Sequence, residues 1–231
     1  PDSAFTHLTG WGSATVPGAV LVIDARTKTH KEKLFLMPTA GKNSDEFFAN
    51  PAIGEFWVGP RPTLAQVETQ LGIKTADIKK LEKHLETLPK PITQKNKKLA
   101  TTLSEMRLVK DDWEVTQMRK AVEITISGFS DVAASLPVAS RKSRGERVVE
   151  TAFFSRARQE GYDIGYETIA ASGPHACILH WTKNDGEVKN GDLILVDAGV
   201  ELDSLYTADI TRTIPVSGKF TKEQRWVYDK I

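Results

Sequence analysis

The chain of 231 residues has a single cysteine, Cys177, so no intrachain disulfide framework can form. No apolar run approaches the roughly 20 residues of a membrane-spanning helix, and we see no signal-peptide pattern among the first residues. Basic and acidic residues nearly balance, at 31 and 30. Because no charge of one sign dominates, we expect neither a nucleic-acid partner nor membrane binding. The single cysteine favours a reducing compartment, so we expect a cytoplasmic protein.

Both ends of the sequence resemble the interior of a longer polypeptide. The first residue is Pro1, and the stretch that follows already looks like the middle of a domain. Near the other end, Thr221 and Gln224 have the spacing of a capping box for a helix that the sequence barely begins. We therefore expect this chain to be a truncated fragment of a longer protein.

The N-terminal part alternates short apolar runs with segments of helical spacing. The runs predict buried strands at 19–23 and 33–37 and a candidate third strand at 56–58. Helical spacing of apolar residues predicts helices over 63–71 and 78–88. Strands that alternate with helices are typical of a small α/β domain. A proline- and lysine-rich linker follows, and we assign domain and linker together to residues 1–98.

After residue 98 the pattern changes to long helices followed by antiparallel strands, which is typical of an α+β domain. We predict a long helix over 104–136, either continuous or divided into two pieces. Asp111 and Asp112 would lie at the start of the second piece. A second helix is predicted over 143–160, where Ser143 and Glu146 have capping-box spacing. Strands are predicted at 166–171, 192–200 and 206–216.

Two aspartates interrupt the apolar strands of the last hairpin, Asp197 after LILV and Asp209 before Ile210. A carboxylate buried in an apolar core is costly unless it is paired, hydrogen-bonded or bound to a metal. With the turn at 202–204, Asp197 would face Asp209 directly across the hairpin. Two such carboxylates repel unless a proton or a divalent cation lies between them. The alternative is that the aspartates lie at strand ends in water, and the residues alone leave both interpretations open.

Three stretches closely resemble the Xaa-Pro aminopeptidases, the aminopeptidase P branch of the pita-bread metallopeptidases. They are SGPHACILHWTKND from residue 172, GDLILVDAG from residue 191 and YTADITRTIPVSGKFTKEQR from residue 206. HLTGW and FWVG, in the N-terminal part, resemble the N-terminal domain of the same family. The similarity covers most of the chain. It implies an N-terminal α/β domain of the creatinase and aminopeptidase P type, followed at 99–231 by the first half of an α+β pita-bread catalytic domain.

The resemblance also implies two divalent metal ions, commonly Mn2+, held by two aspartates, one histidine and two glutamates. Asp197 matches the first aspartate of the family motif and Asp209 the second. The histidine and both glutamates would lie beyond the end of this sequence, so we expect the full ligand set to be absent from this chain. The spacing between the aspartates is one residue longer than is usual in the family. We therefore expect a longer turn or a bulge at 201–205.

Three further residues are candidates for the site. His180 matches a family histidine that lines the substrate pocket and assists the intermediate without binding metal; a structural, hydrogen-bonded histidine is the alternative. Tyr166 is a candidate pocket residue or a core residue, and Trp57 is a candidate for reaching a neighbouring subunit's pocket or a core residue. We expect His175 to be an ordinary loop residue and Cys177 to be a small buried apolar residue.

The implied activity of the complete protein is hydrolysis of the bond between an N-terminal residue and a following proline, so its substrate would be a peptide with proline at the second position. The alternatives are a prolidase that cleaves Xaa-Pro dipeptides, and a domain of the same fold that binds peptides or partners without catalysis. We expect the isolated chain to be inactive. Because half a catalytic sheet exposes apolar surface, we expect a homo-oligomer or association with the missing C-terminal half.

Overall fold

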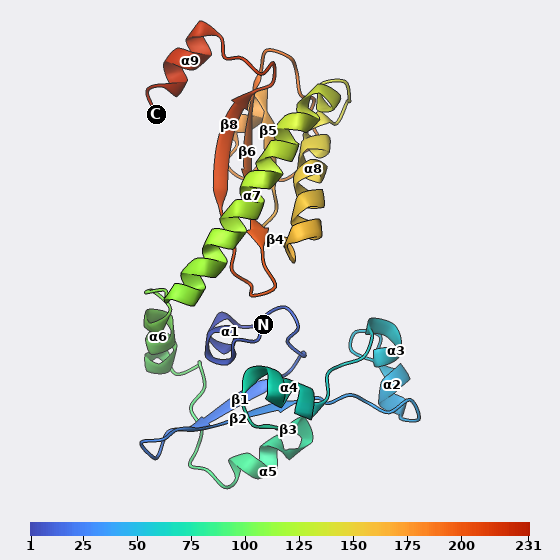
Figure 1. Cartoon of the computed structure of the whole chain (residues 1–231), viewed down its shortest axis with the longest axis vertical. Coiled ribbons are helices and arrows are strands. Elements are labelled where there is room, and N and C mark those ends of the chain that lie inside the picture. Colours follow the sequence, from blue (N-terminus) through green and yellow to red (C-terminus); the bar gives the residue numbers. More distant parts are fainter. The chain divides into compact units, whose positions relative to one another are not determined.

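The computed structural model describes all residues from 1 to 231, which form two compact units, Pro1–Val109 and Lys110–Ile231. Figure 1 shows the elements of each unit. The boundary predicted from the sequence lies at residue 98, whereas helix α6 (Lys97–Met106) belongs to the first unit in the structure. The two units are described separately below.

The first unit is an α/β domain around a small sheet with the strand order β1-β2-β3. Its strands are β1 (Val20–Asp24), β2 (Lys31–Leu36) and β3 (Thr75–Asp77). Its other helices are α1 (Ser3–Thr9), α2 (Asp45–Ala49), α3 (Glu55–Val58), α4 (Leu64–Leu71) and α5 (Leu81–Leu85), with a 3-10 turn at Ile78–Lys80. Strand β1 pairs antiparallel with β2, and β2 pairs parallel with β3.

Helices pack on both faces of this sheet because β2 alternates its side chains. Leu34 and Leu36 are fully buried in a cluster that includes Trp11 and Val67 of α4. Phe35 points the other way, where its ring lies 5.1 Å from the ring of His84 in α5. The two strands predicted at 19–23 and 33–37 are thereby confirmed.

The third strand predicted at 56–58 is wrong, because those residues form helix α3 and the third strand is β3. We name the segment 45–58, which holds α2 and α3, the aromatic arm. Its exposed aromatic side chains are Phe48, Phe56 and Trp57. The indole N–H of Trp57 donates to the carbonyl of Phe48, over 3.0 Å.

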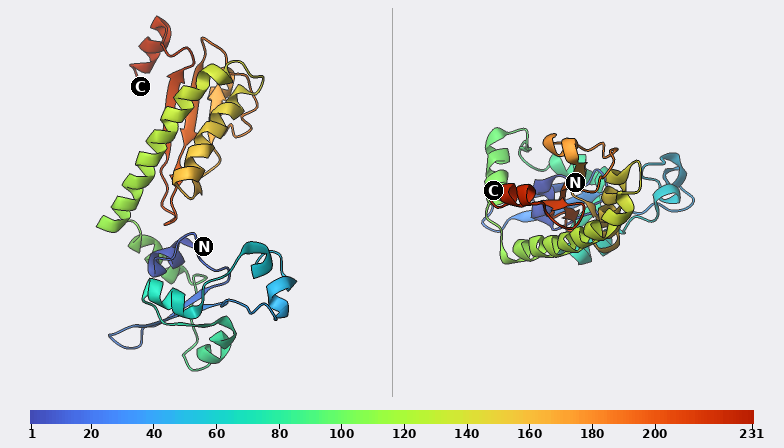
Figure 2. Two further views of the ribbon diagram at one scale, coloured as in Figure 1. Left: turned by 45° about the vertical axis from the view of Figure 1, so that its right-hand side comes forward. Right: turned by 90° about the horizontal axis from the view of Figure 1, so that it is seen from above.

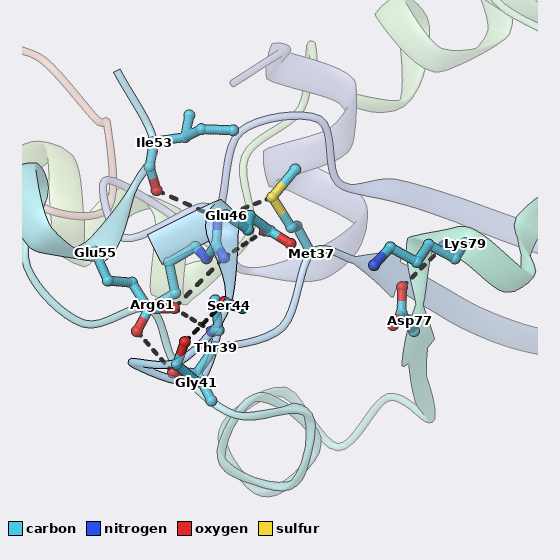
Figure 3. A network of polar contacts seen from close by, with 11 residues as sticks. Met37, Thr39, Gly41, Ser44, Glu46, Ile53, Glu55, Arg61, Asp77 and Lys79 are labelled. Carbon is cyan, nitrogen blue, oxygen red and sulfur yellow. Dashed lines mark hydrogen bonds and ion pairs between the residues drawn. The ribbon is translucent and has the colours of Figure 1, made fainter. Parts of the chain in front are cut away.

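A buried arginine fastens the aromatic arm to the rest of the first unit (Figure 3). The Arg61 side chain is 7% exposed, donates to Glu46 of α2 over 2.7 Å and lies 3.4 Å from Glu55 of α3. Glu55 accepts from the hydroxyl of Thr39 over 2.9 Å and from the Ala40 amide. Arg61 also donates to the carbonyl of Ile53. These contacts attach the arm to the rest of the unit, while the exposed aromatic side chains named above face solvent.

The second unit contains two long helices and a central antiparallel sheet with the strand order β5-β6-β8. The helices are α7 (Asp112–Ala139), α8 (Gly145–Glu160) and α9 (Lys222–Tyr228), with a 3-10 turn at Gly173–Cys177. The strands are β4 (Asp163–Ile164), β5 (Ile169–Ser172), β6 (Leu193–Ala198), β7 (Val200–Glu201) and β8 (Ile210–Pro215). Strands β4 and β7 form a separate antiparallel pair. The expected α+β arrangement is therefore present.

The starts of α7 and α8 are made differently. Helix α7 begins with a capping box in which Asp111 and Glu114 each accept from the other's backbone amide. The capping box predicted for Ser143 and Glu146 is wrong, because α8 begins at Gly145 without a side-chain cap. A Cβ at Gly145 would lie 2.5 Å from the Ala139 carbonyl, so a glycine lets the chain pass closely from α7 to α8.

Helices α7 and α8 lie side by side on one face of the central sheet (Figures 1 and 2). Along β6, the residues Ile194, Val196 and Ala198 are fully buried against these helices, and Asp197 points to the opposite face. That opposite face has no helical layer in this unit. No helix is both long and apolar enough to cross a membrane.

Helix α7 also carries apolar residues on a second face. Its buried residues include Ala121, Ile124 and Val132, whereas Met118 and Ile126 are 39% and 56% exposed. Val115, Met118 and Val122 line an open cavity of about 450 Å3 on this exposed side. Met118 and Ile126 thus belong to an uncovered face of α7, distinct from the face packed on the sheet.

Candidate metal centre

The last hairpin has a different register from the predicted one. Asp197 pairs with Thr211 and Ala198 with Ile210, and the same register places Asp209 opposite Gly199. The turn lies one residue further along the chain than predicted, at 203–205, since the Leu202 amide donates to the Tyr206 carbonyl over 3.0 Å; within it, Leu205 has a φ of 65°. Asp197 and Asp209 are consequently diagonal neighbours. Because positions two apart along a strand share a face, the two carboxylates still project to the same side.

Gly199 allows the two strands to approach closely beside these aspartates. A Cβ at this position would overlap the carbonyl oxygen of Ala208 and would lie 3.2 Å from the Tyr166 ring. Any side chain there would therefore displace both the backbone next to Asp209 and the ring of Tyr166.

One hydroxyl group connects the two carboxylates. The Tyr166 hydroxyl lies 2.6 Å from Oδ1 of Asp197 and 2.9 Å from Oδ1 of Asp209. The two oxygens can therefore be no further apart than the sum of these distances. A phenol has one proton and donates to one acceptor at a time, so the second carboxylate lacks a donor. Burial, and next the hydrogen bonds to Asp197 and Asp209, raise the pKa of Tyr166, which keeps the phenol protonated at neutral pH.

Four of the five candidate residues from the sequence line one open cavity of about 410 Å3. Tyr166, His180, Asp197 and Asp209 all belong to its wall, together with Thr182. The fifth, Trp57, lies in the first unit, where it is 57% exposed.

The aspartates are more exposed than their apolar neighbours in the sequence suggest. Asp209 is exposed and Asp197 is half-buried, and Cys177, expected to be buried, is also exposed. The carboxylates lie on the sheet face that α7 and α8 leave open. Electrostatic repulsion within the pair is consequently a stronger reason for a cation than the cost of burying either charge.

These residues fit part of the ligand set of a divalent cation. Two carboxylates that share a single donor supply the oxygen ligands that hard divalent ions prefer. No group of three or more His, Cys, Asp or Glu side chains in the structure is arranged so that it could hold a metal ion. The chain thus offers two carboxylates that could contact a cation at this cavity.

A buried glutamate that was not predicted from the sequence contacts the loop that carries His180. Glu146 is fully buried, and its carboxylate accepts from the amides of Ser172 and Gly186 over 2.8 and 2.7 Å. It also contacts the Trp181 indole N–H over 2.9 Å and Nδ1 of His175 over 2.8 Å. His175 is therefore more than an ordinary loop residue.

The sequence did contain one signal for this burial. Glu146 lies three, seven and eleven positions before Val149, Phe153 and Ala157, which are the buried residues of α8. A charged residue on the apolar face of a helix needs buried partners. The capping-box spacing gave a competing explanation for Glu146.

A second buried polar residue supports the same region. The side-chain oxygen of Asn184 accepts from the Ala170 amide over 2.9 Å, and its amide donates to the Thr168 carbonyl over 2.8 Å. Asn184 has a φ of 47°, a left-handed conformation that asparagine tolerates better than most residues. It fastens the segment after His180 to the edge of β5.

Comparison with protein families gives two adjacent matches. Residues 1–99 match the model described as aminopeptidase P, N-terminal domain, and residues 116–231 match the model described as metallopeptidase family M24. A curated relative, Xaa-Pro aminopeptidase 1 of Streptomyces coelicolor, is 39% identical over 98% of this chain and 49% of its own length.

Solved structures of aminopeptidase P are also similar to this chain. Aminopeptidase P from E. coli in its low-pH form has a TM-score of 0.74 and 27% identity over 99% of this chain and 56% of its own. A zinc-substituted form of the E. coli enzyme in complex with product has a TM-score of 0.73 and 26% identity, with the same coverage. The chain spans about half the length of the relatives that it matches.

Proposed function

Because this chain belongs to metallopeptidase family M24, we propose that the complete protein is an aminopeptidase that hydrolyses the bond between an N-terminal residue and a following proline. The observation that carries the proposal is the shared hydroxyl between Asp197 and Asp209, in the same cavity as His180. The family description supports a metal-dependent hydrolase, and the named relatives support the proline-specific substrate.

We propose Asp197 and Asp209 as ligands of two divalent ions, with Mn2+ as the native metal and the remaining ligands outside this chain. Bound divalent ions would polarise the scissile carbonyl and supply hydroxide near neutral pH. Tyr166 would donate its proton to the carboxylate oxygen that is not engaged, and so hold the acidic side chains in orientation. Residues 1–98 form the N-terminal domain and linker in this proposal, and 99–231 the first half of the catalytic domain.

His180 and Tyr166 are the proposed residues that contact the peptide in this unit. His180 stands on the cavity wall beside the two carboxylates, where its ring can donate to the oxyanion that forms when water adds to the scissile carbonyl. Tyr166 lines the same cavity, with its hydroxyl in contact with both carboxylates.

Trp57 is proposed as a substrate-binding residue for the pocket of a neighbouring subunit. Its exposure and its fixed position on the aromatic arm support this role. The exposed apolar residues Met118 and Ile126 on α7 support a homo-oligomer or association with the rest of the catalytic domain. A cytoplasmic location is part of the same proposal, since Cys177 is a free thiol.

An assay with Mn2+ tests this function on the complete protein and on the 231-residue chain. We expect the complete protein to cleave an Xaa-Pro-Xaa tripeptide, and Asp197→Asn and Asp209→Asn to reduce kcat/KM by at least about 100-fold, since outer-shell partners alone cost 10–100-fold. We expect the chain alone to be inactive, and turnover by it would contradict the incomplete ligand set. A preference for Xaa-Pro dipeptides would instead indicate a prolidase, and peptide binding without cleavage a non-catalytic module.

A further inference from the structure

The buried carboxylate of Glu146 holds both ends of the loop that carries His180. On one side of the loop it accepts from the Ser172 amide at the end of β5 and contacts His175. On the other side it accepts from the indole of Trp181 and from the Gly186 amide. The Glu146 amide in turn donates to the Gly186 carbonyl over 3.1 Å, so helix and loop are joined through both backbone and side chain.

The two ends of the loop also contact each other directly. The rings of His175 and Trp181 stack with their centroids 3.8 Å apart and an angle of 25° between their planes. The residues between these two rings form the tip of the loop, which is exposed to solvent, with Leu179 89% exposed. Both ends of the loop therefore contact the single carboxylate of Glu146, whereas the tip between them is exposed to solvent.

His180 immediately precedes Trp181, and Thr182 immediately follows it; both neighbours line the cavity of the aspartate pair. The orientation of Trp181 therefore decides where these two side chains stand. Glu146 contacts neither Asp197 nor Asp209, whose carboxylates are linked through Tyr166 instead. A change at Glu146 can consequently move His180 without removing the acidic pair.

We propose that Glu146 is a positioning residue, which clamps both ends of the 173–186 loop and thereby fixes His180 beside Asp197 and Asp209. The inference rests on the proposed function for the chemical role of His180. The clamp itself rests on the hydrogen bonds and the ring stack described above.

Glu146→Gln is the sharpest substitution because it keeps the size of the side chain and removes the charge. Each carboxylate oxygen of Glu146 faces a backbone amide, Ser172 on one side and Gly186 on the other. The new NH2 group must therefore oppose an N–H donor in either orientation. Glu150→Gln, one turn further along α8, is the matched control because Glu150 makes none of these contacts.

The kinetic test is a double-mutant cycle with His180→Ala in the complete enzyme. We expect Glu146→Gln to lower kcat by about 10–100-fold, the range for residues that orient functional groups, while Mn2+ affinity changes by less than about threefold. In the His180→Ala background, we expect the same substitution to cost less than about threefold, because both changes remove one function. An equal cost in both backgrounds, or an unchanged kcat, would overturn the proposal.

A second test uses the 231-residue chain and needs no activity. With 15N-labelled histidine, the five imidazoles can be followed by NMR and His180 assigned through His180→Gln. We expect Glu146→Gln to shift the signals of His175 and His180 and to leave that of His7, in the first unit, unchanged. Glu150→Gln should shift none of these signals.

If Glu146→Gln fails to fold, Trp181→Phe replaces it, because it keeps a ring for the stack and deletes only the indole donor. We expect it to shift the His180 signal as well. An unmoved His180 signal in the variant that folds would overturn the clamp, even if the complete enzyme cleaves Xaa-Pro-Xaa peptides. A wild-type protein that cleaves no such peptide would overturn the proposed function and leave the NMR result to decide the clamp.

Discussion

The hydroxyl of Tyr166 is the one polar group that both aspartates share, and its removal has a predictable cost. Tyr166→Phe should lower the free energy of unfolding of the metal-free chain by about 1–2 kcal/mol, since a hydrogen bond to a charged group is lost and the carboxylates repel. Saturating Mn2+ should reduce this loss, because a cation replaces the proton between the carboxylates. Urea denaturation with and without Mn2+ measures both effects. Tyr228→Phe, at an exposed ring, is the control.

The same hydroxyl predicts a pH dependence. The pKa of Tyr166 is raised, first by burial and then by its two carboxylate partners. A raised pKa in the folded state contributes stability that is fully present below the unfolded value of about 10 and is lost as the pH rises toward the folded value. The stability difference between wild type and Tyr166→Phe should therefore shrink above about pH 10. A constant difference between pH 7 and 11 in urea titrations would contradict this explanation.

Gly199 gives a steric prediction next to the same site. Gly199→Ala should destabilise the chain by about 1–3 kcal/mol, the usual cost of overpacking, because the new methyl group overlaps the Ala208 carbonyl. It should also weaken Mn2+ binding by displacing Asp209 and Tyr166. Gly41→Ala, where no atom lies within 4 Å, should change neither quantity. Thermal unfolding and calorimetric Mn2+ titration measure the two effects.

At the scale of elements, the short β4–β7 pair contains a charge conflict. Glu201 lies directly opposite Asp163, and its pKa is raised by burial first and by Asp163 second. The stability that Glu201 contributes is present below its unfolded pKa and is lost as the pH rises through the folded value. Glu201→Gln should therefore stabilise the chain at pH 7 by about 0.2–1 kcal/mol and have little effect near pH 4. Urea denaturation at both pH values tests this, and a loss of stability at pH 7 would refute it.

The sequence predicts elements well where the determinants are local. The capping box predicted at Thr221 and Gln224 is present, and Asp111 caps the start of α7 where a helix start was predicted, whereas the same spacing at Ser143 and Glu146 makes no cap. The register of the last hairpin is wrong by two positions, because it depends on a turn in which Leu205 adopts a left-handed conformation. A turn of that kind at leucine carries no recognisable sequence signal.

In the candidate site, too, the residues could be predicted from the sequence, whereas the contacts between distant segments could not. The sequence predicts Asp197, Asp209, His180 and Tyr166, and the fold brings all four to one cavity; their roles stay predictions. The clamp at Glu146 could not be predicted, because its partners lie 26 to 40 positions away. The exposure of the aspartates was likewise inaccessible, since it depends on which layers cover the sheet and not on neighbouring residues.

At the scale of the whole molecule, the uncovered face of α7 predicts association. Met118 and Ile126 are exposed on a helix whose other face is fully packed, and exposed apolar patches of this kind mark interaction sites. We expect the 231-residue chain to self-associate at micromolar concentrations, and Met118→Lys with Ile126→Lys to shift it toward its monomer mass of 25.5 kDa. Sedimentation velocity measures this. A wild-type chain that sediments as a monomer would contradict it, and Arg119→Lys is the control.

The exposed sulfur of Cys177 offers a practical consequence of the loop's shape. It is the sole thiol of the chain and lies three positions before His180, on the tip that Glu146 secures. A maleimide spin label would therefore attach at one place without any engineered cysteine. Paramagnetic broadening of its nitroxide spectrum by Mn2+ would then report how near an ion comes to the tip.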